Sequence, residues 1–393
     1  MSLLSVDNVT HRYPTTTSEI PVLNAVSLEV EPSSVVAVVG ESGCGKTTLG
    51  RLVVGLAKPM AGQVRYEGKD IWGLSKKEWQ MYRRSVQVVH QDPYASLNPG
   101  LTVEDTLKAG LLYHRVVRRR DVRDELLRLL RLVDLEAGPA FLRRYPHQLS
   151  GGQRQRLVVA RAMSLRPRLV VADEAVSMLD VSMRVSVLDL LLSLRSEHQL
   201  AYIFISHDFG VVRYFSRGGR IVVMFFGVIV EEGPAEQVIS HPRHPYTFLL
   251  LDAIPVPDPR LARRRRSEVT SKAEERVTGE PSPAGCIFSN RCPFAEDRCR
   301  AEAPPLVETM PGPDHRVACW FPERVPDLEK IVEETVQAPT AEIPDGLAMR
   351  PQDESARERT VDNAPSGGTF APAWDGHAVA GHARAAASDA RPG

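Results

Sequence analysis

The chain has 393 residues, and 49 Lys and Arg against 49 Asp and Glu give a formal net charge of zero at pH 7. With 43% hydrophobic and 25% charged residues, the composition is that of a globular protein, which excludes disorder along the whole chain. The balanced charge argues against a protein that binds nucleic acid mainly through bulk electrostatics.

The N-terminal segment up to Pro21 is polar and lacks the apolar stretch of a secretory signal. The longest apolar run, Ile221 to Val230, is too short to cross about 30 Å of hydrocarbon, which needs about 20 helical residues. We therefore expect a soluble chain that reaches a membrane only through partners. Five cysteines without an export signal favour reduced thiols or metal ligands over disulfides.

Short β-rich runs alternate with helical patterns from residue 1 to about 254, which is typical of an α/β domain with a mainly parallel sheet. The runs are almost continuously apolar, as expected for strands that are covered on both faces. Strands are predicted at 35–40, 86–90, 169–173, 202–206 and 221–226. A helical pattern over 102–135 predicts a subdomain placed on the sheet.

The first of these strands leads into Gly-Glu-Ser-Gly-Cys-Gly-Lys-Thr at 40–47, which fits the phosphate-binding loop G-x-x-x-x-G-K-[ST]. Glycines let backbone N–H groups surround phosphates, and the following helix adds the positive end of its dipole. Lys46 is expected to contact the β- and γ-phosphates, and Thr47 to offer its hydroxyl to Mg²⁺. Alkylation of Cys44, inside this loop, is expected to block ATP binding.

Two carboxylates, Asp173 and Glu174, end the apolar strand at 169–173. Standing alone, such a pair is more often a strand that runs into a loop. Downstream of a phosphate-binding loop, it predicts that Asp173 holds Mg²⁺ through water and that Glu174 polarises the attacking water.

Leu-Ser-Gly-Gly-Gln at 149–153 precedes a helix that is predicted over 154–163. This segment resembles the signature sequence of ATP-binding cassette (ABC) ATPases. The resemblance implies a P-loop nucleotide-binding fold with a parallel-sheet core, an N-terminal antiparallel β region and a helical subdomain at about 92–165. It also implies that two cassettes pair head to tail, so that Ser150 and Gly152 contact the nucleotide of the partner. A Ser-capped helix is the plain structural alternative, and the two interpretations are compatible.

Further elements of the ABC family follow in order, and their roles are implied by the resemblance. Tyr13 would stack on adenine, Gln91 would sense Mg²⁺ and couple to membrane subunits, and His207 would contact the γ-phosphate. The loop at 177–180 matches the D-loop. Ala175 departs from the usual Asp-Glu-Pro, which we expect to loosen the approach to that loop.

The resemblance thus assigns three sets of residues in this site. Those expected to bind ATP are Tyr13, Gly40, Ser42, Gly43, Gly45, Lys46, Thr47, Thr48, Ser150, Gly151, Gly152, Gln153 and Asp180. Those expected to act in catalysis are Glu174, His207 and Gln91. Those expected to hold Mg²⁺ are Thr47, Gln91 and Asp173.

The C-terminal half resembles the ATPase subunits of oligopeptide and dipeptide importers, through His-Pro-Arg-His-Pro-Tyr-Thr at 241–247 and Gln-Asp-Pro-Tyr at 91–94. His-Pro pairs are also ordinary turn chemistry, and we assign them no metal. The resemblance implies two transmembrane permease subunits, a second cassette as homo- or heterodimer, and an extracytoplasmic solute-binding protein. It places the chain on the cytoplasmic face of the membrane. Peptide is the expected solute, with oligosaccharide, nickel or glutathione as alternatives.

Four cysteines, Cys286, Cys292, Cys299 and Cys319, fall close together after a Pro- and Arg-rich stretch. Gathered thiolates suit an iron–sulfur cluster or Zn²⁺, with buried thiols as the third possibility. Their spacing is not the C-x2-C pair that is usual for structural zinc. Some members of the importer family bind a [4Fe-4S] cluster there, and the resemblance implies one here.

The expected domains are a nucleotide-binding domain at 1–254, a linker at 255–284, a Cys-rich domain at 285–325 and a mostly disordered tail at 326–393, with a helical patch near 328–336. The alternative functions are a soluble ABC ATPase that acts on nucleic acid or the ribosome, and an exporter cassette. The first usually carries two cassettes in one chain, and the second is usually fused to its membrane domain. Nucleic acid is therefore not an expected partner.

Overall fold

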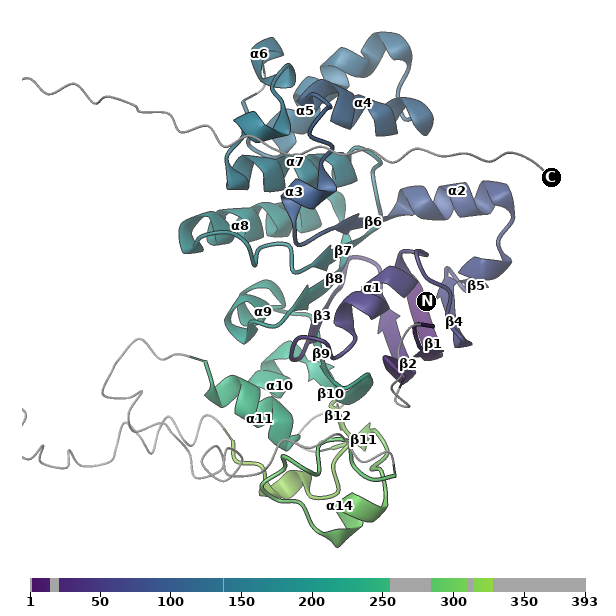
Figure 1. Cartoon of the computed structure of the whole chain (residues 1–393), viewed down its shortest axis with the longest axis vertical. Coiled ribbons are helices and arrows are strands. Elements are labelled where there is room, and N and C mark those ends of the chain that lie inside the picture. The colour runs from purple at the N-terminus through teal and green to yellow at the C-terminus, as the bar shows by residue number, and fades with distance from the viewer. Residues whose placement is uncertain (1, 15–20, 137, 255–283, 310–313, 328–393) are drawn as a thin grey trace, which may run out of the picture. The chain divides into compact units, whose positions relative to one another are not determined.

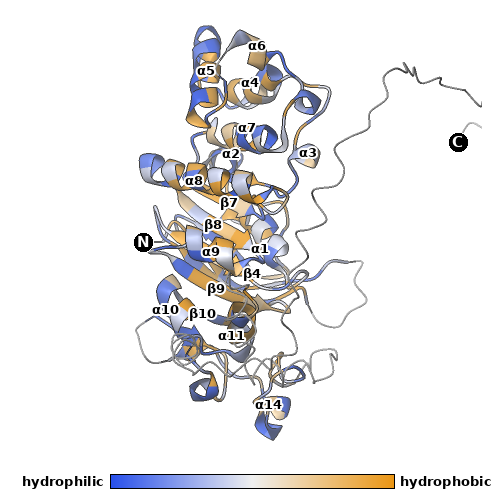
Figure 2. Cartoon of the chain, turned by 90° about the vertical axis from the view of Figure 1, so that its left-hand side faces the viewer, coloured by the Kyte–Doolittle hydropathy of each residue, from blue (hydrophilic) through white to orange (hydrophobic). Residues whose placement is uncertain are grey.

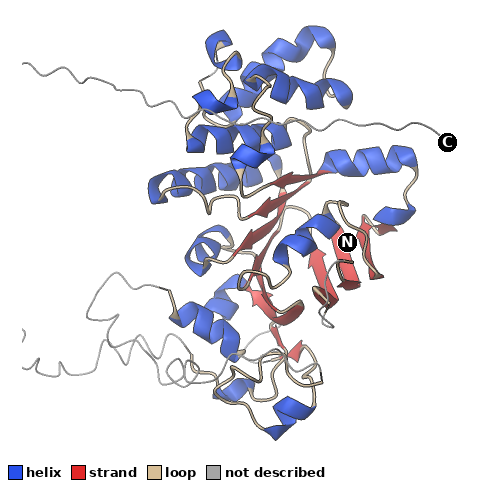
Figure 3. Ribbon diagram, viewed as in Figure 1, coloured by secondary structure: helices blue, strands red, loops and turns tan. Residues whose placement is uncertain are grey.

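The computed structural model describes residues 2–14, 21–136, 138–254, 284–309 and 314–327. The main sheet has the strand order β11-β12-β10-β9-β3-β8-β7-β6 (Figures 1 and 3). Its bounds are β3 Val35–Val39, β6 Val86–Val89, β7 Leu169–Asp173, β8 Ala201–Ser206, β9 Arg220–Phe225, β10 Val228–Pro234, β11 Val307–Glu308 and β12 Arg316–Val317. The strands from β9 to β6 are parallel to one another, whereas β10, β12 and β11 run antiparallel.

A second, antiparallel sheet has the order β2-β1-β4-β5, with β1 Leu4–His11, β2 Leu23–Val30, β4 Ala61–Tyr66 and β5 Lys69–Asp70. The predicted core strands and the antiparallel N-terminal region are confirmed. The apolar run from Ile221 to Val230 is two strands and not one, because Phe226 and Gly227 both have positive φ angles and form the tight turn of a hairpin.

Helices cover both faces of the main sheet (Figure 1). They are α1 Lys46–Val53, α2 Lys76–Ser85, α3 Pro93–Ser96, α4 Val103–Tyr113, α5 Val122–Leu132, α6 Pro139–Leu142, α7 Gly151–Met163, α8 Val181–His198, α9 Phe209–Phe215, α10 Ala235–Ser240, α11 Pro245–Asp252 and α14 Asp297–Ala301. The single helical stretch predicted over 102–135 is two helices, α4 and α5, joined through a short 3-10 turn at Arg119–Asp121.

Two apolar cores lie on opposite faces of the main sheet, whose strands β7, β8 and β9 are coloured as hydrophobic in Figure 2. In β3, Val36 and Val38 belong to the core with α1 and the antiparallel sheet, whereas Val35 and Val39 belong to the core with the helical subdomain. The latter core also includes Phe288 from the Cys-rich segment. This segment therefore shares its apolar core with the nucleotide-binding domain.

The structure leaves part of the predicted domain organisation without a test. Most of the predicted linker, the helical patch near 328–336 and the predicted disordered tail lie outside the described residues. Within the described residues, β12 pairs with β10, so the segment that carries the four cysteines extends the main sheet. No helix in the described part of the chain is long and apolar enough to span a membrane.

Candidate ATP site

The loop at 40–45 joins the end of β3 to the start of α1. Gly45 caps α1 with a φ of 105°, and a Cβ atom there would lie 2.6 Å from the Val22 carbonyl oxygen. At Gly40 a Cβ atom would lie 2.2 Å from the Met224 carbonyl oxygen. Only glycine fits these two positions without moving the backbone, so they fix the shape of the phosphate-binding loop.

Lys46, the first residue of α1, is 5% exposed and points back into the loop. Its Nζ donates hydrogen bonds to the carbonyl oxygens of Gly40, at 2.8 Å, and Glu41, at 2.9 Å. The ammonium group therefore lies inside the loop that the sequence predicts to surround phosphates. An incoming phosphate would replace these carbonyl oxygens as the hydrogen-bond partner of the Lys46 ammonium group.

The two side chains expected to hold Mg²⁺ from α1 and β7 lie together. The Thr47 hydroxyl donates to the Asp173 carboxylate at 3.2 Å. Asp173 is 9% exposed, and this burial raises the pKa of its carboxyl group. The hydrogen bond from Thr47 lowers the pKa by a smaller amount. A bound cation would favour the charged carboxylate, because it replaces the water that burial removes. Gln91 follows β6, which runs parallel to β7, so it lies at the same edge of the sheet and is exposed.

Glu174 and His207 lie at the ends of the neighbouring strands β7 and β8. The His207 Nδ1 and a Glu174 carboxylate oxygen are 3.1 Å apart. Glu174 has a φ of 49°, in the left-handed region that few residues other than glycine adopt, and its N–H donates to the Ile205 carbonyl at 3.0 Å. A cavity of about 40 Å³ lies beside both side chains. Backbone strain at such a position is a common feature of functional sites.

Tyr13 lies against the same helix. Its hydroxyl is 3.3 Å from the Thr48 hydroxyl, and its ring makes an edge contact with His11, with centroids 5.0 Å apart. This arrangement brings the predicted adenine-stacking residue to α1, directly behind the phosphate-binding loop. The stacking of Tyr13 on adenine stays a prediction.

The signature segment begins α7. Ser150 caps the helix, accepting from the Gln153 N–H at 3.2 Å, while the Gln153 side chain accepts from the Ser150 N–H at 3.0 Å. A Cβ atom at Gly152 would lie 2.7 Å from the Met183 Sδ. Among the described residues, no hydrogen bond or ion pair joins this segment to the phosphate-binding loop of the same chain.

The D-loop leads into α8, whose first turn Asp180 caps by accepting from the Met183 N–H at 2.9 Å. These hydrogen bonds lower the pKa of Asp180. The neighbouring apolar side chains Met178 and Val181 are 60% and 76% exposed. Both apolar side chains are therefore open to solvent on either side of this cap.

Cys44 is 4% exposed, and burial raises the pKa of its thiol. The thiolate is the reactive form of cysteine, so alkylation at this site should be slow. The expected block of ATP binding by Cys44 alkylation stays a prediction, and its burial means that the reaction would need long exposure to the reagent.

The His-Pro-Arg-His-Pro-Tyr segment is held by a buried carboxylate. Glu231 in β10 is fully buried and accepts from the N–H groups of Arg243, at 2.7 Å, and His244, at 2.9 Å. It is also 2.7 Å from the Nε2 atom of the buried His315. His244 caps α11, its Nδ1 accepting from the Tyr246 N–H at 3.1 Å, and burial lowers the pKa of His244 to about 3. The motif thus has a structural role.

The four clustered cysteines carry thiols and form no disulfide. Cys286, Cys292 and Cys299 are buried, and burial raises the pKa of Cys319 to about 12, with a smaller contribution from each of the other three. Within the described residues, no three His, Cys, Asp or Glu side chains are arranged to hold a metal ion. The metal centre at the four cysteines therefore stays a prediction.

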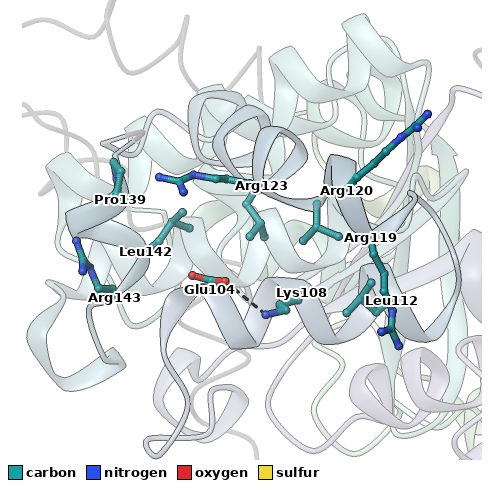
Figure 4. Close-up of a pocket in the computed structure, with 11 residues that line it drawn as sticks. Glu104, Lys108, Leu112, Arg119, Arg120, Arg123, Pro139, Leu142 and Arg143 are labelled. Atoms are coloured by element: carbon teal, nitrogen blue, oxygen red, sulfur yellow. Dashed lines mark hydrogen bonds and ion pairs between the residues drawn. The ribbon is translucent and has the colours of Figure 1, made fainter.

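A cavity of about 670 Å³ lies among α4, α5 and α6 and is separate from this site (Figure 4). Most of its polar lining is basic, including Lys108, Arg119, Arg123 and Arg143, and the Glu104 carboxylate lies 3.5 Å from the Lys108 Nζ. None of the residues expected to bind ATP lines it.

Sequence reasoning missed three residues that the structure connects to the site and its surroundings. Glu41 lies inside the phosphate-binding loop, but its position in that motif accepts any residue. Arg291 is one of many arginines in the sequence, and no motif distinguishes it from the others. Glu231 read only as part of a strand, although a carboxylate in an otherwise apolar strand is a signal that a buried partner exists.

Comparison with known proteins agrees with this geometry. The ABC transporter family matches residues 23–177, and the C-terminal region of oligopeptide/dipeptide transporters matches residues 230–299. Over 326 residues, the chain is 46% identical to a Sinorhizobium fredii protein named "Probable peptide ABC transporter ATP-binding protein y4tS", covering 81% of this chain and 89% of that one. It is 41% identical to the oligopeptide transport ATP-binding protein OppF of Salmonella typhimurium, covering 76% of this chain and 86% of that one.

Among solved structures, a dimeric ATP-binding cassette bound to ADP and Pi in a post-hydrolysis state aligns with a TM-score of 0.52 and 28% identity, covering 59% of this chain and 98% of that one. The fold is that of an ABC ATPase. The chain belongs to the ATP-binding proteins of ABC transporters and carries the C-terminal region of the oligopeptide/dipeptide group.

Proposed function

We propose that this chain is the ATP-hydrolysing subunit of a membrane importer for oligopeptides or dipeptides. The observation that carries the proposal is the meeting of Thr47 with Asp173, and of Glu174 with His207, at the carboxyl edge of the sheet beside the phosphate-binding loop. This edge is where open α/β sheets bind their ligands. The names of the relatives and the C-terminal family match support peptide as the solute.

Each residue then has a defined task in hydrolysis. Lys46 and the loop N–H groups hold the β- and γ-phosphates, and Tyr13 supports the adenine. Mg²⁺, held by Thr47 and Asp173 and sensed by Gln91, would neutralise the phosphate charge that develops in the reaction. Glu174 accepts a hydrogen bond from the attacking water and draws away its proton, while His207 contacts the γ-phosphate.

The second half of the site comes from another cassette. Ser150, Gly151, Gly152 and Gln153 would present the N-terminus of α7 to the γ-phosphate bound by the partner. The exposed apolar side chains of Met178 and Val181 support this pairing, because they flank Asp180 at the edge that would meet the partner. Closure of the two cassettes on ATP and their opening after hydrolysis would move two permease subunits.

Contact with the permeases is proposed at the segment around Gln91. Tyr94, in the short helix that follows, is 64% exposed, and the Arg154 guanidinium stacks over its ring at 3.9 Å. An aromatic side chain that is supported in this way is a good anchor for a partner helix. The chain would accordingly be peripheral at the cytoplasmic face of the membrane, with the solute-binding protein on the opposite side.

A [4Fe-4S] cluster at Cys286, Cys292, Cys299 and Cys319 is part of the proposal. Four thiols without disulfides, three of them buried and the Cys319 thiol partly buried, form a suitable donor set. The described residues show no grouping of three side chains that could hold a metal ion, and this finding applies equally to the cluster and to zinc. Iron content and visible absorption of anaerobically purified protein would test the proposal, and zinc without iron would contradict it.

Co-purification tests the importer function. The tagged Glu174→Gln chain, purified with ATP from detergent-solubilised membranes, should retain two multi-spanning subunits, a second cassette and a solute-binding protein. The Lys46→Ala, Glu174→Gln double variant is the matched control, since it should lose the ATP-dependent cassette. Ribosomal proteins or DNA-repair factors without a membrane subunit would contradict the proposal. The ligand on the solute-binding protein would distinguish peptide from oligosaccharide, nickel or glutathione.

A further inference from the structure

The phosphate-binding loop is tied to the Cys-rich segment by an ion pair between residues 250 positions apart in the sequence. The two terminal nitrogens of Arg291 donate to the two carboxylate oxygens of Glu41, both at 2.9 Å. Such a bidentate pair fixes orientation as well as distance. Both side chains are about one-third exposed, so solvent screens their attraction only in part.

The same residue is also held through its backbone. The Glu41 N–H donates to the Tyr246 hydroxyl oxygen at 2.7 Å. Tyr246 is 1% exposed, and its ring packs against Phe225 and Phe288, with centroids 4.7 Å and 5.5 Å away. A buried hydroxyl that is fixed by two aromatic neighbours is a rigid acceptor. Two residues of the C-terminal part of the chain therefore hold Glu41: Tyr246 binds its backbone N–H and Arg291 binds its carboxylate.

Arg291 reaches the loop in a supported conformation. Its guanidinium lies over the rings of Phe225 and Phe288, 5.7 Å from each centroid. Its own N–H donates to the Phe288 carbonyl at 3.0 Å, in the turn that ends at Cys292. Because the aromatic rings hold the guanidinium, little side-chain freedom is lost when it pairs with Glu41. The folded state of the Cys-rich segment thus determines where this positive charge lies.

The position of Glu41 makes this contact relevant to nucleotide binding. Its carbonyl oxygen accepts from the Lys46 Nζ, so any shift of Glu41 also shifts the partner of the phosphate-binding lysine. An unpaired carboxylate beside the loop would also repel the phosphates of ATP, and Arg291 neutralises it. Both effects favour ATP when the contact is formed.

We propose that Arg291 and Tyr246 are positioning residues of the ATP site, through which the Cys-rich segment sets the affinity for ATP. The inference rests on the proposed function, because it assumes that the loop binds ATP. It extends that function by making the C-terminal region part of the nucleotide site, and it requires no bound metal.

ATP affinity of the full chain, measured with a fluorescent ATP analogue, tests the proposal. Arg291→Ala should weaken binding by about tenfold, which corresponds to about 1.4 kcal/mol and is near the lower end for a hydrogen bond to a charged group. Arg291→Lys should fall between Arg291→Ala and the wild type, because lysine keeps the charge but cannot form the bidentate pair. Arg298→Ala is the matched control: Arg298 stacks on Trp320 at 3.5 Å in the same segment and pairs with Glu302, so affinity should not change.

Rescue separates positioning from a merely structural role. In the Arg291→Ala background, Glu41→Gln should recover part of the lost affinity, because it removes the unpaired carboxylate. An Arg291→Ala chain with wild-type affinity, or a double variant that binds no better than Arg291→Ala, would overturn the proposal. If Arg291→Ala does not fold, the ATP affinity of Arg291→Lys tests the proposal in its place. An affinity equal to that of the wild type would overturn the proposal. Failure of the wild-type chain to bind ATP would instead contradict the proposed function.

Discussion

The carboxyl edge of the main sheet and the C-terminal part of the chain are stabilised in different ways. At the sheet edge, backbone geometry dominates: left-handed glycines shape the phosphate-binding loop, and Glu174 is fixed by a hydrogen bond to β8. In the C-terminal part, buried side chains dominate: Glu231 joins β10, the His-Pro segment and His315. The shape of the ATP site therefore depends mainly on backbone conformation. The contacts of the C-terminal part depend on individual side chains, so single substitutions can remove them one at a time.

The largest expected effect is at the sheet edge. Glu174→Gln should lower the ATP turnover of the assembled complex by about 100-fold or more, since a positioned general base contributes roughly that much. ATP binding should persist, because the substitution keeps the size of the side chain. Phosphate release under saturating ATP measures the turnover. The control is Glu308→Gln in β11, an exposed carboxylate, which should leave turnover unchanged. Equal turnover in the Glu174→Gln and wild-type complexes would remove Glu174 from the chemistry.

The next effect concerns stability in the C-terminal part. Glu231→Ala leaves one buried and one partly buried N–H group and a buried histidine without their acceptor, and should lower the free energy of unfolding by about 3 kcal/mol. Urea denaturation followed by tryptophan fluorescence measures this loss. Glu236 provides the control: it is exposed, its carboxylate accepts from the Gly218 N–H at 3.0 Å, and Glu236→Ala should cost less than about 1 kcal/mol. Similar losses in the two variants would contradict the role given to Glu231.

A smaller effect is the pH dependence of stability through His244. Burial lowers the pKa of this histidine to about 3, whereas in the unfolded chain it is near 6.5. Between these values the unfolded state binds the extra proton, so stability falls as pH decreases from about 6.5 towards 3, by at most about 1.4 kcal/mol per pH unit. His244→Asn keeps a side-chain acceptor for the α11 cap and should flatten the slope of melting temperature against pH from 6.5 to 5. An unchanged slope would show that His244 does not titrate in this way.

Much of the fold and the site followed from local patterns. The strands at 35–39 and 169–173 were predicted because a buried parallel strand is an uninterrupted apolar run. The phosphate-binding loop was predicted because its glycines and lysine are adjacent in the chain. The division of 102–135 into α4 and α5 was not predicted, because the sequence from Arg118 to Asp121 fits a continuous helical pattern.

The contacts of the C-terminal part could not be predicted for a different reason. The hydrogen bond from the Glu41 N–H to Tyr246 and the pair of Glu41 with Arg291 join residues 205 and 250 positions apart. No periodicity or motif spacing relates such positions, and only the three-dimensional fold brings them together. The cysteines were visible as a group, but their spacing alone left cluster, zinc and buried thiols open.

The central claim is that the C-terminal part of the chain belongs to the ATP site. Linkage requires that if the contact of Glu41 with Arg291 and Tyr246 favours ATP, then ATP favours the contact to the same extent. Amide hydrogen exchange of the full chain, with and without ATP and Mg²⁺, measures this directly. The account predicts that ATP slows exchange both in the phosphate-binding loop and in the segment 286–292, and that Lys46→Ala abolishes both effects. Protection of the loop with no change in 286–292 would contradict the claim.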